Sequence, residues 1–324
     1  MALHRLVIVS DIHYAGAAEQ ARGNDYEMQA ITSGFRRWMV RMWRHHLWLR
    51  DPFGHNQKLD HFLSECPQAD YVIANGDYSC DSAFIGVSDE AACASAVECL
   101  GKLRDKFNSE LRTTIGDHEF GKKSLGSGSG GMKLASLKTT RDTLKLPTSW
   151  RMELDKYVVI GMTSSLAASP SLIGDQAEDE QEGWQAEHQQ HMSEVRELFR
   201  GIDSTRRIIL FCHDPTALPF LWEDAEVRRF IPQIERTIIG HLHSNLIFRQ
   251  ATLMAGLPAI RFLGPTITRN TQAVNRARLW KPFNVQLCPS LAGMQLLRDG
   301  GYLTMELDGN AGAPATSQFH SVPW

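Results

Sequence analysis

The chain of 324 residues lacks several features that mark specialised classes of protein. It has no apolar run long enough for a transmembrane helix. Its first residues lead directly into a predicted strand, so we expect no signal peptide. Its six cysteines show no metal-finger spacing, which favours free thiols in a reducing cytoplasm. Because we find neither an internal repeat nor a long linker, we expect one domain over residues 1–324.

An excess of charge of one sign is also missing. The net charge of −3 predicts no whole-protein attraction to nucleic acid. Hydrophobic residues make up 43% and charged residues 22%, which is ordinary for a soluble globular protein. Short apolar runs alternate with helical patterns, and this alternation predicts an α/β fold. Helices are predicted over 89–107 and 181–200, and strands over 6–9, 71–74, 112–115, 208–212, 237–239, 259–263, 294–297 and 302–307.

Five short polar motifs each follow one of the first five predicted strands. Side chains bind ligands beyond the carboxyl ends of strands in α/β sheets, so we expect these motifs to meet. Each motif alone is weak evidence, since a lone histidine is more often a core residue. Glycines at 76, 116 and 240 fit tight turns that bring backbone close to an ion. In chain order the motifs contain Asp11 and His13; Asp77; Asp117, His118 and Glu119; His213; and His241 and His243.

This ordered set resembles the motifs of the calcineurin-like metallophosphoesterase superfamily. The resemblance implies an α/β fold of the four-layer α/β/β/α sandwich type, with the site at the strand ends. It also implies two divalent metal ions, and carboxylate and imidazole ligands suit Mn²⁺, Fe or Zn²⁺. By the same resemblance one ion is held by Asp11, His13 and His243, the other by Asp117, His213 and His241, and Asp77 bridges both.

The chemistry that this resemblance implies is hydrolysis at phosphorus. Two ions about 4 Å apart can activate a bridging hydroxide and stabilise both ends of an in-line displacement. His118 follows a ligand directly and is the candidate general acid for the leaving oxygen. The alternative is a structural histidine that hydrogen-bonds to Glu119 or to backbone.

Two positions depart from the family pattern. The usual third motif reads Gly-Asn-His, whereas this chain has Asp117 before His118. With three carboxylates, the net charge of a site that holds two divalent ions and one hydroxide is zero. A ferric ion in place of one divalent ion would make this net charge positive. After the bridging ligand, Asp81 stands one place later than the second acid of the phosphoprotein phosphatases, and their arginine is missing. This argues against that branch, and Asp81 remains only a candidate for orienting His118.

The first of two insertions covers roughly residues 20–62. A helix over 35–49 would place aromatic and methionine side chains on one face and arginines on the other. Residues 35–50 contain five arginines and no acid. Three readings stay open: a helix packed on the sandwich with solvated arginines, a lid over the substrate, or a surface for anionic lipid. The last two predict substrate or lipid binding by Arg37, Arg41, Arg44 and Trp48.

The second insertion, residues 121–131, directly follows the third motif. It is too glycine-rich for a rigid element, so we expect a mobile loop beside the site. Lys122 or Lys123 is a candidate for reaching a phosphate, and plain solvent exposure of both is the alternative.

The sequence therefore predicts a cytoplasmic, dinuclear metal-dependent hydrolase of a phosphoester or pyrophosphate bond. The expected partner is a phosphorylated small molecule or a lipid- or nucleotide-linked substrate, with peripheral membrane contact through residues 35–50. One alternative is a phosphodiesterase for small molecules such as cyclic nucleotides. The other is a non-catalytic scaffold that keeps the fold and binds a partner.

Overall fold

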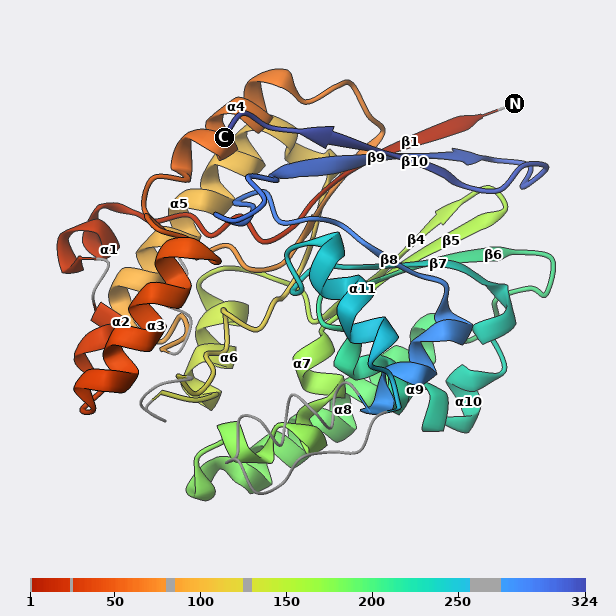
Figure 1. Ribbon diagram of the computed structural model, residues 1–324. Coiled ribbons are helices and arrows are strands. Elements are labelled where there is room, and N and C mark those ends of the chain that lie inside the picture. Colours follow the sequence, from red (N-terminus) through yellow and green to blue (C-terminus); the bar gives the residue numbers. More distant parts are fainter. Residues whose placement is uncertain (1, 24–25, 80–84, 125–129, 257–274) are drawn as a thin grey trace.

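Two five-stranded sheets form the centre of the protein (Figure 1). The structure is a computed structural model, and it describes residues 2–23, 26–79, 85–124, 130–256 and 275–324. The first sheet has the order β10-β9-β1-β2-β3 and the second the order β4-β5-β6-β7-β8. The strands are β1 Leu3–Val9, β2 Tyr71–Asn75, β3 Leu111–Thr114, β4 Ser149–Leu154, β5 Tyr157–Met162, β6 Arg207–Cys212, β7 Ile234–Ile239, β8 Val285–Leu287, β9 Gly301–Asp308 and β10 Thr316–Ser321.

Both sheets are mainly parallel where they carry the motifs. Strands β1, β2 and β3 run parallel, and β9 pairs antiparallel with β1. In the second sheet β5, β6, β7 and β8 run parallel, and β4 pairs antiparallel with β5. The carboxyl ends of β1, β2 and β3 therefore meet at one edge of the first sheet, and those of β6 and β7 meet at one edge of the second.

Alternation along each strand divides the apolar side chains among three cores, because neighbouring residues of a strand face opposite sides of the sheet. Leu6 and Ile8 of β1 join Val159 and Phe211 in a core between the two sheets. Val7 and Val9 enter a second core with the helices outside the first sheet, and the third core lies outside the second sheet. The layers are thus helix, sheet, sheet, helix, and the predicted four-layer α/β/β/α fold is confirmed.

Helices cover the outer faces of both sheets. Leu59 and Phe62 of α4 and Leu100 and Leu103 of α5 pack in the core outside the first sheet. Helices α8, α9 and α10 lie beside the second sheet (Figure 1). The helices are α1 Ala17–Arg22, α2 Tyr26–Gln29, α3 Gly34–His46, α4 Asn56–Glu65, α5 Glu90–Phe107, α6 Leu134–Asp142, α7 Ser164–Ala167, α8 Gln181–Phe199, α9 Leu218–Glu223, α10 Ala225–Arg228 and α11 Asn245–Leu253.

Most predicted elements are confirmed, with boundaries shifted by a few residues. The strands before all five motifs are present, as are both long helices and the strand over 302–307. The strand predicted over 294–297 is wrong. Those residues form a turn in which the backbone N–H of Arg298 donates to the carbonyl of Met294 (2.8 Å), and the exposed Leu296 and Leu297 pair with no strand. The strand predicted over 259–263 lies outside the described residues.

The first insertion is helical, as predicted, but its end belongs to the core. Residues from Asn56 onward form α4, which packs on the first sheet through Leu59 and Phe62. The preceding α3 has no buried residue at all. The reading in which α3 packs its apolar stripe on the sandwich is therefore wrong.

Candidate metal centre

The five predicted motifs meet where the strands of the two sheets end. Backbone hydrogen bonds join their loops directly. The N–H groups of Ile12 and His13 donate to the carbonyl of Asp77 (3.0 and 3.1 Å), and the N–H of Gly240 donates to the carbonyl of His213 (2.9 Å). The Asp11 carboxylate accepts the backbone N–H of His241 (3.0 Å), which connects the first sheet to the second. The loops thus hold one another in place before any ion is considered.

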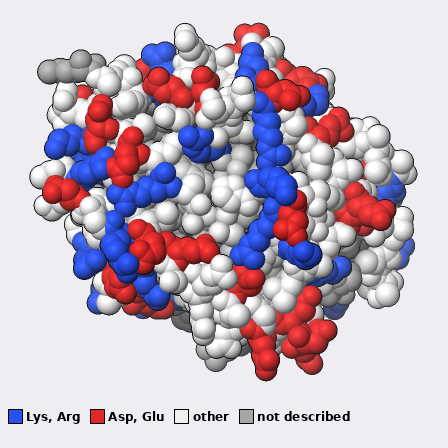
Figure 2. Space-filling view, turned by 180° about the vertical axis from the view of Figure 1, so that it is seen from behind, with Lys and Arg blue, Asp and Glu red and all other residues white. Residues whose placement is uncertain are grey.

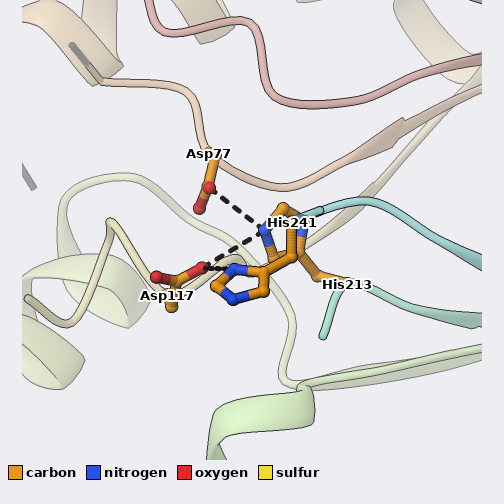
Figure 3. Close-up of side chains that lie close together, drawn as sticks. All are labelled: Asp77, Asp117, His213 and His241. Carbon is orange, nitrogen blue, oxygen red and sulfur yellow. Dashed lines mark hydrogen bonds and ion pairs between the residues drawn. The ribbon is translucent and has the colours of Figure 1, made fainter. Parts of the chain in front are cut away.

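All seven predicted ligands fall into two groups, which a third group connects through Asp77 and His13. Potential ligand atoms of Asp77, Asp117, His213 and His241 all lie within 4.8 Å of one another (Figure 3). Those of Asp11, His13 and His243 form a second such group. Asp77 also lies within the same distance of a His13 nitrogen, because a third group contains His13, Asp77 and His118. Asp77 therefore lies between the two groups, and the partition of the ligands between two ions stays a prediction.

Within the groups, the potential ligand atoms lie at about hydrogen-bonding distance from one another. His213 Nε2 lies 3.1 Å from Asp77 Oδ2 and 3.3 Å from Asp117 Oδ1. In the other group His243 Nε2 lies 3.2 Å from His13 Nε2 and 3.3 Å from Asp11 Oδ1. Two imidazole nitrogens and a carboxylate oxygen that converge in this way are a typical donor set for a transition-metal or zinc ion.

Close approach of backbone explains two of the motif glycines. A Cβ atom at Gly116 would lie 2.1 Å from Asp77 Oδ1, so only glycine lets the third motif pass beside the second. Gly76 has φ of +89° and a built Cβ there would lie 2.7 Å from the nitrogen of Gly116. Both positions require glycine for the carboxylate of Asp77 to stand between the loops.

Backbone strain is concentrated on the candidate ligands. Non-glycine residues with positive φ are uncommon, and they persist where the surrounding structure determines them. Five of the seven candidates adopt φ between 51° and 60°: Asp11, His13, Asp77, His241 and His243. Such a concentration at one place favours a functional role for these side chains.

A buried nitrogen atom without a hydrogen bond tests whether an ion fits. The Nδ1 atom of His213 lies 2.5 Å from the Asn75 carbonyl, which turns Nε2 toward the two carboxylates. This Nε2 is buried without a hydrogen bond in the described part of the chain. Asp11 and Asp77 are also almost completely buried. Three carboxylates and four imidazoles in one buried place fit divalent cations, because unpaired charges in the interior are otherwise strongly unfavourable.

Sequence comparison agrees with this donor set. The sequence model of the calcineurin-like phosphoesterases matches residues 4–245. The chain belongs to this family.

Solved structures of metallophosphoesterases give weaker likenesses. A predicted phosphoesterase from Streptococcus pneumoniae TIGR4 is 12% identical, with 99% of each chain covered and a TM-score of 0.27. A purple acid phosphatase from yellow lupin seeds is 10% identical, with 99% of this chain and 54% of that one covered and a TM-score of 0.39. Comparison with curated proteins gives no match. The assignment therefore rests on the family match and on the site.

In this calcineurin-like phosphoesterase, Lys122 compensates the extra carboxylate. Its ammonium lies 2.8 Å from Asp117 Oδ2, and the two side chains are 32% and 12% exposed. Burial alone would raise the pKa of Asp117, but His241 and Lys122 hold it well below its usual range. Burial would likewise lower the pKa of His241, yet the charge of Asp117 raises it to about 9. Asp117 is therefore ionised and belongs to a small network of opposite charges.

His118 lies beside this network and is almost completely buried. Its backbone N–H donates to Asp77 Oδ1 (3.0 Å), and its Nε2 lies 3.2 Å from the Lys122 ammonium and 3.7 Å from Asp77 Oδ2. Burial lowers the pKa of the imidazole to about 4, which the Asp77 charge only partly offsets. The ring lies beside His13, with centroids 4.5 Å apart, and near Asp77, so its position suits a proton donor to a substrate oxygen or an additional ligand.

Glu119 is a functional residue whose role the sequence did not reveal. Its carboxylate is fully buried and accepts the backbone N–H groups of Asp77 (3.1 Å), Tyr78 (2.8 Å) and Gly116 (2.8 Å). One side chain thus fixes the turns of the second and third motifs. Burial, followed by the charge of Asp77, raises the pKa of Glu119 to about 7. In the sequence, the position of Glu119 directly after His118 was the available indication of this role.

Two further side chains support the ligands. Ser10 Oγ donates to Asp11 Oδ2 (2.6 Å). Asp214 Oδ2 lies 3.8 Å from His241 Nε2, on the side of the ring away from Asp117. Carboxylates on the second nitrogen of a ligating histidine orient the ring and increase its basicity. An acid directly after His213 was the sequence signal for this contact.

The remaining predicted residues divide into near and distant ones. The Trp48 ring lies against the His243 ring, with centroids 4.3 Å apart. Lys122 reaches the centre, whereas the backbone of Lys123 pairs with Gly130 and its N–H donates to Asp175. Arg37 donates to the Ile31 carbonyl and so anchors the start of α3. Arg41 and Arg44 lie on α3, and Asp81 lies outside the described residues.

Proposed function

We propose that this calcineurin-like phosphoesterase is a dinuclear metal-dependent hydrolase of a phosphoester or pyrophosphate bond. The observation that carries the proposal is the meeting of seven carboxylate and imidazole side chains from five strand ends, in two groups that Asp77 connects through its proximity to His13. In this proposal Asp11, His13 and His243 hold one ion, Asp117, His213 and His241 hold the other, and Asp77 bridges them. Two bound ions, as Mn, Fe or Zn, supply Lewis-acid activation of water and of the phosphoryl group.

The residues around the ions have separate tasks in the proposed reaction. His118 is the candidate proton donor to the leaving oxygen, because its Nε2 faces the Asp77 carboxylate at 3.7 Å. Lys122 holds a positive charge 3.2 Å from this nitrogen, where it stabilises developing negative charge on a phosphate oxygen. Trp48 provides an aromatic wall beside His243 for the part of the substrate that is not transferred.

A non-catalytic scaffold is the alternative from a different class. Backbone strain at five candidate ligands argues against it, because a scaffold does not need these side chains in strained conformations. A cyclic nucleotide or another small soluble diester remains the alternative substrate class. Helix α3 ends at His46, directly before Leu47 and Trp48. Its exposed aromatic side chains favour a substrate with a large apolar part.

The test combines metal content with hydrolysis. Protein purified without chelator and loaded with Mn²⁺ is expected to contain two ions per chain by elemental analysis and to hydrolyse bis-p-nitrophenyl phosphate. Asp77→Asn removes the shared carboxylate at constant shape and is expected to lose both ions and the activity. Asp60→Asn, at an exposed carboxylate paired with Lys102, is the control and is expected to keep both. At most one ion after loading would refute the dinuclear centre.

A further inference from the structure

Helix α3 presents its apolar side chains to solvent. Phe35 is 69% exposed, Trp38 57%, Met39 51%, Met42 39% and Trp43 37%. These five residues, which we call the α3 stripe, lie on one face at helical spacing. A surface helix normally turns such a stripe toward the core. Here the stripe is outside, and the helix stands apart from both sheets (Figure 1).

The opposite face of α3 is the one that rests on the protein. The half-buried positions of the helix are Arg37, Val40 and Arg44, spaced by three and four residues, and no α3 residue is fully buried. Ser33 caps the helix start, accepting the N–H of Arg36. The face that carries Arg37 and Arg44 is thus the inner one. This orientation is the reverse of a packed amphipathic helix and leaves the stripe available for a partner.

The size of the stripe indicates that something covers it. Aromatic side chains have about 150–250 Å² of surface each, so the exposed part of the stripe is on the order of several hundred Å². A patch of that size is comparable to the largest apolar patch of a typical monomer, which is often a functional surface. Leu47, Leu296 and Leu297 are 38%, 53% and 39% exposed. The N–H of Leu296 donates to the carbonyl of Leu47 (3.3 Å), so the patch continues onto this neighbouring turn.

Charge selects the kind of partner. Residues 35–50 contain five arginines and two adjacent histidines but no acid. On the face that Figure 2 shows, acidic side chains lie beside basic ones. A second copy of this chain would bring two such basic segments together, which like charges oppose. Aromatic and aliphatic side chains flanked by arginines match the interface of an anionic lipid layer.

The stripe also leads to the metal centre. Trp43 stacks on Trp48 with ring centroids 5.1 Å apart, and Trp48 lies 4.3 Å from the ring of His243. The carbonyl of Trp48 accepts the N–H of Gln295 (2.5 Å), which fixes the end of this aromatic path. A lipid surface that covers the stripe therefore also lies next to the candidate catalytic residues.

We propose that α3 is an interfacial helix that binds an anionic lipid surface and that the substrate is a phosphorylated lipid taken from that surface. The identity of the substrate rests on the proposed phosphoesterase function, whereas surface binding does not. Arg36 and Arg50, both exposed, flank the stripe and contact the headgroup phosphates. Trp43 and Trp48 guide the phosphorylated head toward the ligands.

Vesicle flotation tests the surface. The full chain is expected to float with vesicles of phosphatidylcholine and phosphatidylglycerol, and much less with phosphatidylcholine alone. The triple variant Trp38→Ser, Met39→Ser, Met42→Ser is expected to lose flotation. Its matched control changes three apolar residues of similar or greater exposure elsewhere: Leu3→Ser, Ile173→Ser, Leu253→Ser. The control is expected to float like the wild type, and equal loss in both triple variants would overturn the proposal.

A charge-reversal variant keeps the test valid if the first variant fails to fold. Arg36→Glu with Arg50→Glu leaves the stripe intact. It is expected to weaken binding to anionic vesicles at least roughly twentyfold, since each basic residue near an anionic surface contributes about fivefold. Wild-type binding is expected to weaken as salt increases. Unchanged binding in this variant would show that the arginines do not face the lipid, and would overturn the proposal.

Two further measurements separate the possible failures. Sedimentation velocity without vesicles that shows a wild-type dimer, lost in the stripe variant, together with no flotation, would assign the stripe to self-association and refute lipid binding. Hydrolysis of bis-p-nitrophenyl phosphate by the wild type tests the enzyme independently. A protein that hydrolyses this ester without floating contradicts only the lipid surface, and one that floats without hydrolysing any ester contradicts the proposed function.

Discussion

The ion pair between Asp117 and Lys122 sets the charge of the proposed metal centre. Asp117 lowers that charge by one, and Lys122, 2.8 Å from its Oδ2, restores it. Lys122→Met removes the positive charge and is expected to weaken the binding of a phosphate dianion. Asp117→Asn removes the negative charge. The double variant has the same net charge as the wild type, so it is expected to recover most of the lost affinity.

The magnitude follows from the position of Lys122. Its Nζ lies 3.2 Å from His118 Nε2. A substrate oxygen that hydrogen-bonds to His118 at about 3 Å lies within about 6 Å of Nζ. One unit charge at that distance contributes about 0.7 kcal/mol in bulk water and about 2.8 kcal/mol at an effective dielectric constant of 20. Because the Lys122 side chain is a third exposed, we expect roughly a tenfold increase in KM, about 1.4 kcal/mol.

The assay measures kcat and KM of the four proteins with a phosphomonoester and a phosphodiester. The effect of Lys122→Met is expected to be larger for the monoester dianion than for the diester monoanion. Lys123→Met, at the neighbouring lysine whose backbone pairs with Gly130, is the control and is expected to change KM less than twofold. Metal content is measured in parallel. If the double variant keeps the full KM increase of Lys122→Met, the charge of Asp117 does not balance that of Lys122 and the charge argument is wrong.

The remaining predictions concern single side chains. Asp77→Asn is expected to lose both ions together by elemental analysis, whereas His243→Ala is expected to weaken mainly one. His118→Ala is expected to keep both ions and to lower kcat by roughly 10²–10⁴-fold, less for p-nitrophenolate than for alkoxide leaving groups; loss of an ion would make it a ligand instead. Glu119→Gln replaces one carboxylate oxygen by an NH2 donor that faces one or two of the three backbone N–H groups, so denaturant unfolding is expected to show a loss of about 1–3 kcal/mol. Burial lowers the pKa of Lys58 to about 8, so between about pH 8 and the ordinary pKa of lysine the unfolded chain binds more protons than the folded one. Over that interval the unfolding free energy of the wild type is therefore expected to rise with pH relative to that of Lys58→Met. A fall would contradict this sign.

The strand ends of the site were predictable because each depends on local pattern. Val7, Val72 and Ile209 lie in apolar runs that stop at a Gly or at a polar ligand, and both sheets bury these runs on two faces. The topology then places all carboxyl ends at one edge. The seven ligand candidates that the family resemblance implies therefore lie close together.

The contacts that position the ligands depend on tertiary structure. Glu119 accepts two N–H groups from residues 41 and 42 positions earlier, and no periodic pattern signals this. In the sequence, Lys122 and Lys123 are equivalent candidates. In the structure the ammonium of Lys122 contacts the Asp117 carboxylate, because of the turn that follows Asp117. The 294–297 segment is apolar like a strand, but a positive φ at Gly293 and Arg298 turns it toward Leu47.

The orientation of α3 shows the same limit most clearly. Helical periodicity places Trp38 and Met42 on one face, but it does not say which face meets the protein. The structure turns Arg37 inward, where its guanidinium donates to the Ile31 carbonyl, and leaves the stripe exposed. In α3 a charged residue anchors the helix, whereas the apolar residues of the stripe are exposed. This is the reverse of what hydropathy leads one to expect.

Two features of the protein oppose stability, and they lie next to each other. Positive φ at a non-glycine residue such as His243 costs about 1–3 kcal/mol, and five candidate ligands have it. The exposed stripe of α3 leaves apolar surface in water that a packed helix would bury. Trp48 connects them, because its ring contacts both Trp43 and His243. Bound ions would offset the cost of the strained backbone, and a covering lipid surface would offset the cost of the exposed stripe. Both costs are therefore expected to be lowest when the protein holds metal at a lipid surface. This coincidence of two unfavourable features at one place is the structural reason for treating the metal centre and α3 as parts of one functional surface.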